Sequence, residues 1–184
     1  LAKGRKFRIV FMPFAFSPAR FTRGAQPRNF DIGFTGILRN PNNSTGQGDS
    51  RQRVQAEVFH TAFGLPVRKR AAFRHISVFW RAWTGNRVQD VLWGVGPRNT
   101  SEAEYAGALR NTRLWLNGPS PLGLVSTRYF ECMASGALVL TSPNAGLMKI
   151  FPPTTYVEFT SPGDFLSTIE HYLSSPDELK TITD

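Results

Sequence analysis

The sequence is poor in cysteine, in acidic side chains and in long hydrophobic runs. Cys132 is the only cysteine in 184 residues, so neither an internal disulfide nor a cysteine-rich zinc site can form. The longest apolar stretches, Val10–Phe16 and Ala137–Leu140, fall far short of the roughly 20 residues of a membrane-spanning helix. We therefore expect a protein without a membrane span, located in the cytoplasm. The sequence begins at Leu1 without a Met, a signal peptide or a transit-like segment, so we expect a fragment or processed product of a longer protein.

Acidic residues are scarcest in the first two thirds of the chain. The whole sequence has 22 Lys and Arg against 13 Asp and Glu, a formal net charge of +9. Residues 1–128 hold 20 basic and 6 acidic side chains (+14), whereas residues 129–184 hold 2 and 7 (−5). Arginine supplies 17 of the basic residues, and its planar fork of donors suits phosphate. This composition fits a nucleic-acid-binding surface or an ordinary solvated basic surface equally well.

Apolar segments with strand character alternate with helical segments about every 25 residues, which is typical of a parallel sheet with right-handed crossovers. The expected strands are Ile9–Phe16, Phe30–Leu38, His75–Trp80, Asp90–Gly94, Leu114–Asn117, Ala137–Thr141 and Tyr156–Phe159. The expected helical segments are Asp49–Phe63, Ser101–Asn111, Ser126–Ser135, Gly146–Phe151, Pro162–Ser174 and Pro176–Thr183. The 41% hydrophobic and 19% charged residues are those of a chain with a folded core.

Three loops after expected strands are candidates for ligand binding, because parallel α/β sheets bind ligands at the carboxyl ends of their strands. In the first loop Gly36 lets a ligand approach the backbone and Arg39 can reach a phosphate. This loop has neither the dinucleotide-binding nor the P-loop spacing, and a simple glycine turn is the alternative. The second loop contains Gly96 and Arg98 and is by itself only a turn.

The third loop, rich in Gly, Pro and Ser, runs directly into the helix that starts near Ser126. A helix start offers free backbone N–H groups and the positive end of the helix dipole to an anion. The apolar stripe of this helix is expected to consist of Phe130, Met133, Ala134 and Ala137. A second face is expected to carry Thr127, Arg128, Glu131 and Ser135. Arg128 and Glu131 form either a surface ion pair or a site in which Glu131 accepts hydrogen bonds from ligand hydroxyls.

The segment Ser126–Pro143 (STRYFECMASGALVLTSP) resembles the E-A-M-A-x-G-x-P-V-V helix–strand segment of GT-B glycosyltransferases. The spore-maturation-like group of that family has an Arg-x-Phe-Glu sequence, as the chain does from Arg128 to Glu131. Further stretches match in order: Phe30–Arg39, Trp93–Ser120 and Tyr156–Leu173. The resemblance covers roughly residues 30–175 and implies an α/β, Rossmann-like sheet with helices on both faces, one half of a GT-B fold. It also implies a UDP- or GDP-type nucleotide sugar as substrate, with no other cofactor and no metal.

The resemblance implies a role for individual residues. Glu131 aligns with the carboxylate that holds the nucleotide ribose, beside Arg128. The backbone amides that face the diphosphate align with Gly123, Leu124, Val125, Ser126 and Thr127. Gly36 and Arg39 align with the first phosphate loop, and Gly96–Arg98 lies near the base. Gly123 stands where many relatives carry a second Glu.

The resemblance also implies that the acceptor-binding N-terminal domain, which usually supplies the general base, is not part of this chain. The catalytic residues are therefore unknown, and the fragment is expected to be an enzyme that is inactive alone. Residues 1–30 are expected to be an interdomain connector or terminal strand, and residues 31–184 the donor-binding domain. The alternative is a non-catalytic basic Rossmann-like module that binds nucleic acid or an assembly partner. The remaining reactive side chains are expected to be surface or packing residues: His60, His75, His171 and Cys132.

Overall fold

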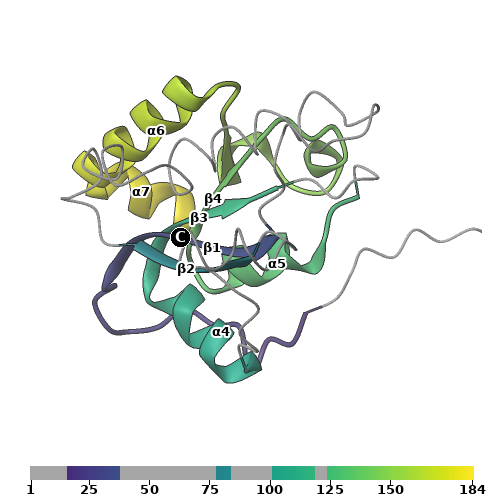
Figure 1. Cartoon of the computed structure of the whole chain (residues 1–184), viewed down its shortest axis with the longest axis vertical. Coiled ribbons are helices and arrows are strands. Elements are labelled where there is room, and N and C mark those ends of the chain that lie inside the picture. The colour runs from purple at the N-terminus through teal and green to yellow at the C-terminus, as the bar shows by residue number, and fades with distance from the viewer. Residues whose placement is uncertain (1–15, 38–77, 84–100, 119–123) are drawn as a thin grey trace, which may run out of the picture.

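The computed structural model describes residues 16–37, 78–83, 101–118 and 124–184 (Figure 1). In chain order the elements are β1 (Phe30–Ile37), β2 (Val78–Trp83), α4 (Glu102–Arg110), β3 (Thr112–Asn117), α5 (Thr127–Ala134), β4 (Leu138–Thr141), η3 (Leu147–Lys149), η4 (Pro153–Thr155), β5 (Tyr156–Glu158), α6 (Pro162–Ser174) and α7 (Pro176–Thr183). The strand expected at 9–16, except for its last residue Phe16, lies outside the described residues, as do the strand expected at 90–94 and the helix expected at 49–63. Among the described helices, none has the length and apolarity that crossing a bilayer requires.

The strands form one parallel sheet in the order β2-β1-β3-β4-β5. Ile32 in the central part of β1 pairs with Val78 of β2 on one side and with Leu114 of β3 on the other. The chain therefore leaves β1 toward one edge of the sheet and returns to build the other half from β3 onward. The strand order reverses between β1 and β3, which is the place where open α/β sheets bind ligands.

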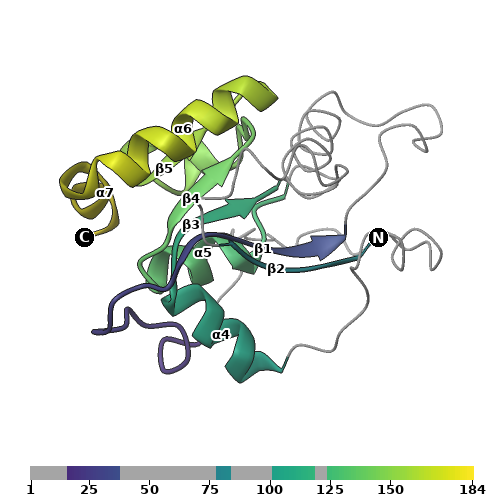
Figure 2. The same cartoon turned by 60° about the vertical axis from the view of Figure 1, so that its left-hand side comes forward.

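Helices cover both faces of the sheet, with α6 and α7 on one side and α4 and α5 on the other (Figure 2). Successive side chains of a strand point to opposite faces, so β3 and β4 contribute to two cores. The core under α6 contains Ile32, Phe34, Leu114, Leu116, Leu138, Leu140, Phe159, Phe165 and Ile169. The core under α4 and α5 contains Phe21, Ala106, Ala108, Leu109, Trp115, Val125, Tyr129, Cys132, Ala137, Val139, Leu147 and Tyr156. The expected Rossmann-like sheet with two covered faces is confirmed.

The helix starts follow local capping signals. Ser101 accepts a hydrogen bond from the backbone N–H of Glu104, and the Glu104 side chain reaches back to the Ser101 backbone, which completes a capping box. Ser161 caps α6 through the backbone N–H of Asp164, and a proline follows at the first helical position. The expected bounds of α6 and α7 are confirmed without change.

Two strands differ from the expectation by more than one residue. The strand expected at His75–Trp80 continues to Trp83, because Ile32–Ile37 of β1 pairs with Val78–Trp83 of β2 residue by residue, while residues 75–77 lie outside the described part of the chain. Pairing along a neighbouring strand thus extends β2 through Arg81, where the apolar pattern stops. β3 begins at Thr112, two residues earlier than expected, since Phe30 pairs with Thr112 at the start of β1.

The apolar stripe expected on α5 is confirmed in part. Ala137 is buried in the core, and Phe130, Met133 and Ala134 pack half-buried against it, but the fully buried residues of the helix are Tyr129 and Cys132. Phe16, from the segment before β1, stacks on Phe130 with ring centroids 6.3 Å apart. A second apolar side of α5 is therefore covered by residues far away in sequence. The burial of Cys132 confirms that it is a core thiol.

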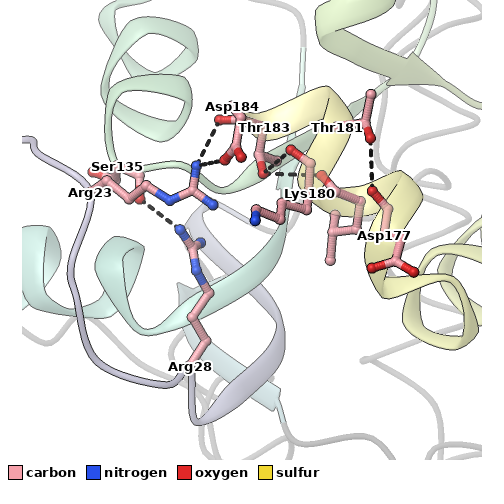
Figure 3. A network of polar contacts seen from close by, with 9 residues as sticks. Arg23, Arg28, Ser135, Asp177, Lys180, Thr181, Thr183 and Asp184 are labelled. Atoms are coloured by element: carbon pink, nitrogen blue, oxygen red, sulfur yellow. Dashed lines mark hydrogen bonds and ion pairs between the residues drawn. The ribbon is translucent and has the colours of Figure 1, made fainter.

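Residues 16–29, the leading segment, pack along α4 and α5 and then cross the amino edge of the sheet (Figures 1 and 2). Arg28 donates to the carbonyl oxygens of Thr112 and Ser135, the latter at 3.0 Å. Ser135 was expected on a polar face of α5 and is instead fully buried beneath this contact. Arg23 donates to the Thr183 carbonyl oxygen at 3.3 Å and forms an ion pair with Asp184 (Figure 3).

Candidate functional site

The carboxyl ends of β1 and β3 meet where the strand order of the sheet reverses, and α5 begins at the same edge. In this topology every helix that follows a strand starts at the carboxyl edge, so its N–H groups face whatever binds there. Gly36 lies inside β1, where its backbone pairs with Ala82 of β2. The other expected loop residues lie outside the described part of the chain: Arg39, Gly96, Arg98 and Gly123.

The first turn of α5 differs electrostatically from those of its neighbours. The side chain of Ser126 makes no capping hydrogen bond, and the first turn contains no acidic residue. By contrast, α4, α6 and α7 each carry Asp or Glu in the first turn. Arg128 adds a positive charge to the positive end of the α5 dipole, which is unfavourable for an isolated helix. The start of α5 therefore lacks the negative charge that a bound anion would supply.

Arg128 reaches across the edge of the sheet to β1. Its Nη1 donates a hydrogen bond of 2.8 Å to the carbonyl oxygen of Thr35. The ion pair between Arg128 and Glu131, one of the two alternatives for these residues, is not formed: Arg128 contacts Thr35 and Glu131 contacts Tyr105. A guanidinium carries five N–H donors in a rigid fork, so Arg128 can hold Thr35 and a ligand anion at once.

Glu131 lies one turn further along α5, and its Oε2 accepts a hydrogen bond of 3.0 Å from the hydroxyl of Tyr105. Burial raises the pKa of Tyr105 far above its ordinary value, and the negative charge of Glu131, which accepts its hydrogen bond, raises it further. The charge of Arg128 acts in the opposite direction on the same hydroxyl. Tyr105, Arg128 and Glu131 thus form one polar cluster on the α4–α5 side of the sheet.

The residues just before α5 connect this cluster to the core. Val125 is buried in the core under α4 and α5, whereas Leu124 is 50% exposed. Ser126 and Thr127 are half-buried at the start of the helix. The structure therefore brings the expected residues 124–128 and Glu131 together at one edge of the sheet.

A second polar group at the carboxyl ends of β3 and β4 was missed by the sequence analysis. Asn117, Ser142 and Asn144 are buried, and the backbone N–H of Asn144 donates to Glu158 at 3.3 Å. The side-chain nitrogens of both asparagines and the Ser142 hydroxyl have no hydrogen-bond partner among the described residues. Buried polar atoms of this kind usually bind ordered water or a ligand. Their only sequence signal is their position directly after strands.

Histidine and acidic residues make no metal centre in the described ranges: no group of three or more His, Cys, Asp or Glu side chains is placed to hold an ion. His171 lies on the surface, where its Nε2 is 2.9 Å from Oε2 of Glu178. It is the surface residue that the sequence predicts. His60 and His75 lie outside the described residues.

The fold and the edge at which α5 starts define the class of protein: a Rossmann-like domain like those of GT-B glycosyltransferases. The C-terminal domain of the group 1 family glycosyl transferase LpcC from Francisella tularensis is similar, with a TM-score of 0.52 and 13% identity over 92% of this chain and 93% of that one. Sucrose-phosphate synthase from Thermosynechococcus elongatus is similar with a TM-score of 0.52 and 14% identity, over 92% of this chain and 44% of that one. The chain thus spans less than half of sucrose-phosphate synthase and nearly all of the LpcC domain.

A family model described as "Glycosyl transferase-like" matches residues 68–184, which is almost two thirds of the chain. The chain therefore belongs to this glycosyl transferase-like family. No curated protein sequence matches it.

Proposed function

We propose that this chain is the donor-binding half of a glycosyltransferase and holds a nucleoside-diphosphate sugar of the UDP or GDP type at the carboxyl ends of β1 and β3. Family membership supports glycosyl transfer as the class of reaction. The observation that carries the site is the start of α5, where an uncapped helix end, Arg128 and Glu131 lie together.

Each part of the donor has a matching group. The diphosphate is bound by the backbone N–H groups at the start of α5 and by the guanidinium of Arg128. Glu131, three residues or about 4.5 Å further along the helix than Arg128, accepts hydrogen bonds from ribose hydroxyls. As the sugar leaves, negative charge grows on the nucleoside diphosphate, and the same cationic groups stabilise it. Because Arg128 is already fixed on Thr35, little reorganisation is needed.

The acceptor and the general base belong to the rest of the protein in this proposal. The LpcC structure is itself a C-terminal domain of a longer glycosyl transferase, and this chain covers 93% of it. An N-terminal acceptor-binding domain is thus the proposed partner of the chain. The proposal includes transfer without a metal ion.

A nucleic-acid interface finds less support. Every arginine whose side chain the structure describes contacts another group of the chain: Arg20, Arg23, Arg28, Arg110, Arg113 and Arg128. Three of these contacts are ion pairs with Asp or Glu. The described arginines therefore all have partners within the chain, which leaves no described arginine that only a nucleic acid would explain.

Isothermal titration calorimetry of the 184-residue chain with UDP and GDP tests the proposal. We expect one of the two to bind, and Glu131→Ala to weaken that binding about 10-fold or more, since a hydrogen bond to a charged group is lost. Glu170→Ala, which removes an exposed carboxylate on α6, is the matched control and should bind normally.

Unchanged affinity in Glu131→Ala would rule out the ribose role. Binding to random DNA that falls steeply with salt, without affinity for either nucleotide, would favour the nucleic-acid module instead.

A further inference from the structure

We infer that Tyr105 is a positioning residue for the donor site: it holds one carboxylate oxygen of Glu131 so that the other faces the nucleotide ribose. This inference rests on the proposed function, which supplies the ligand. It adds a residue from another helix, 26 positions away, to the site.

The contact fixes one oxygen of the carboxylate. The Tyr105 hydroxyl donates to Oε2 of Glu131 at 3.0 Å, while Oε1 accepts no hydrogen bond from any residue in the described ranges. Glutamate has three rotatable side-chain bonds, and a half-buried carboxylate without such a donor would sample several orientations. Because Oε2 is held, Oε1 keeps one orientation. A fixed acceptor of this kind can bind a ligand hydroxyl at one defined position.

The side chain of Tyr105, which donates this hydrogen bond, is itself held from two sides. Phe21 of the leading segment contacts the Tyr105 ring edge-on, with centroids 5.9 Å apart, and Trp115 of β3 does so at 6.1 Å. Phe21 and Trp115 are both buried. Aromatic pairs in this geometry are favourable beyond the area that they bury. The phenol therefore has little freedom to follow Glu131 if the carboxylate moves.

The hydroxyl is also a permanent donor. Since burial raises the pKa of Tyr105, the phenol stays protonated throughout the range in which proteins work. A carboxylate is an acceptor only, so the direction of this hydrogen bond is fixed. The ribose hydroxyls must then act as donors to Oε1.

A purely structural link between α4 and α5 makes a different prediction. Such a link would affect stability in the same way as any buried hydroxyl, without regard to the ligand. Tyr129 provides the comparison, because it lies on α5 itself and its hydroxyl is 2.9 Å from Oγ1 of Thr141. If Tyr105 positions Glu131, removing the Tyr105 hydroxyl should weaken nucleotide binding only where the ribose hydroxyls are present.

The test compares ribonucleotides with their 2′-deoxy forms on the 184-residue chain. The affinities of UDP and dUDP, and of GDP and dGDP, are measured by calorimetry, and the ribo-to-deoxy ratio is the readout. We expect Glu131→Gln to bring the ratio close to one. Tyr105→Phe, which removes only the hydroxyl, should reduce it roughly three- to tenfold. The double variant should match Glu131→Gln alone.

Tyr129→Phe is the matched control, with the same atom removed from a buried tyrosine. It should lower the melting temperature and leave the ratio unchanged. If Glu131→Gln keeps the wild-type ratio, the proposed ribose role of Glu131 is wrong, and so is the positioning role of Tyr105. If Glu131→Gln removes the preference but Tyr105→Phe retains it fully, the donor site stands and the positioning role of Tyr105 is wrong.

Discussion

Gly33 of β1 lies directly against the indole of Trp115 in β3. A Cβ atom at residue 33 would overlap the ring, at 2.5 Å from Cε3, and would lie 3.0 Å from Cγ2 of Thr112. The two strands form the junction at which the sheet reverses its order. The absence of a side chain at Gly33 thus lets Trp115, the largest fully buried side chain among the described residues, lie over this junction.

We predict that Gly33→Ala destabilises the protein by about 2–3 kcal/mol, because the added methyl group forces Trp115 out of a filled core. Gly107→Ala is the control: nothing lies within 4 Å of the position of its Cβ on α4. There alanine should stabilise by about 0.5–1 kcal/mol through its helix propensity. Urea unfolding followed by tryptophan fluorescence measures both, and equal effects of the two substitutions would contradict the close contact.

The buried tyrosines predict a loss of stability in alkali. Burial is the main cause that raises the pKa of both Tyr105 and Tyr129 above 10.0. A group whose pKa is raised by folding contributes its full stability below the unfolded pKa and loses it as the pH rises above that value. The melting temperature should therefore fall above about pH 10, where unfolded tyrosine releases its proton.

The shifted pKa of Arg28 changes the pH dependence of stability in the opposite direction. Burial, together with the charges of Arg23 and Arg113, lowers its pKa to about 10, so this group favours the folded state as the pH rises from there. Because two tyrosines destabilise the folded state in alkali and one arginine stabilises it, the melting temperature should fall as the pH rises. Melting curves of the wild type and of Tyr129→Phe between about pH 8 and about pH 11 measure this. A flat profile in the wild type, or a steeper one in Tyr129→Phe, would be inconsistent with buried, protonated tyrosines.

Arg128 should act on phosphate rather than on ribose. We predict that Arg128→Ala weakens UDP or GDP binding about tenfold and leaves binding of the corresponding nucleoside unchanged, because only the diphosphate contacts the guanidinium. Stability should change by less than about 1 kcal/mol, since the side chain is exposed. Arg110→Ala, which removes an arginine on α4 that donates to the carbonyl oxygen of Arg20, is the control. Equal losses for nucleoside and nucleotide would place Arg128 elsewhere in the site.

Local signals in the sequence predict the helices well. Ser101 and Ser161 cap their helices within four residues of sequence, so α4 and α6 start where the pattern predicts. β2 depends on backbone pairing with β1, more than 40 residues earlier, and it ends three residues beyond the expected Trp80. Strand ends are set by the neighbouring strand, which no local pattern contains.

The candidate site likewise contains residues that local sequence predicts and partners that depend on how distant elements pack. Arg128 and Glu131 were predicted from one stretch of sequence, because a helix start and the next turn lie on a single segment. Their actual partners, Thr35 and Tyr105, come from β1 and α4 and depend on how these elements pack. Tyr105 is the one aromatic residue in an otherwise small-residue and charged helix, which is a weak signal.

The ion pair between Arg23 and Asp184 holds the leading segment beside residue 184 at the amino edge of the sheet. The start of α5 lies at the opposite edge (Figure 2). A fluorophore, an affinity handle or a surface tether attached at residue 184 therefore stands on the far side of the sheet from the proposed nucleotide site. An immobilised protein would present the edge with the proposed site to solution, which suits the chain to ligand screening on a sensor surface.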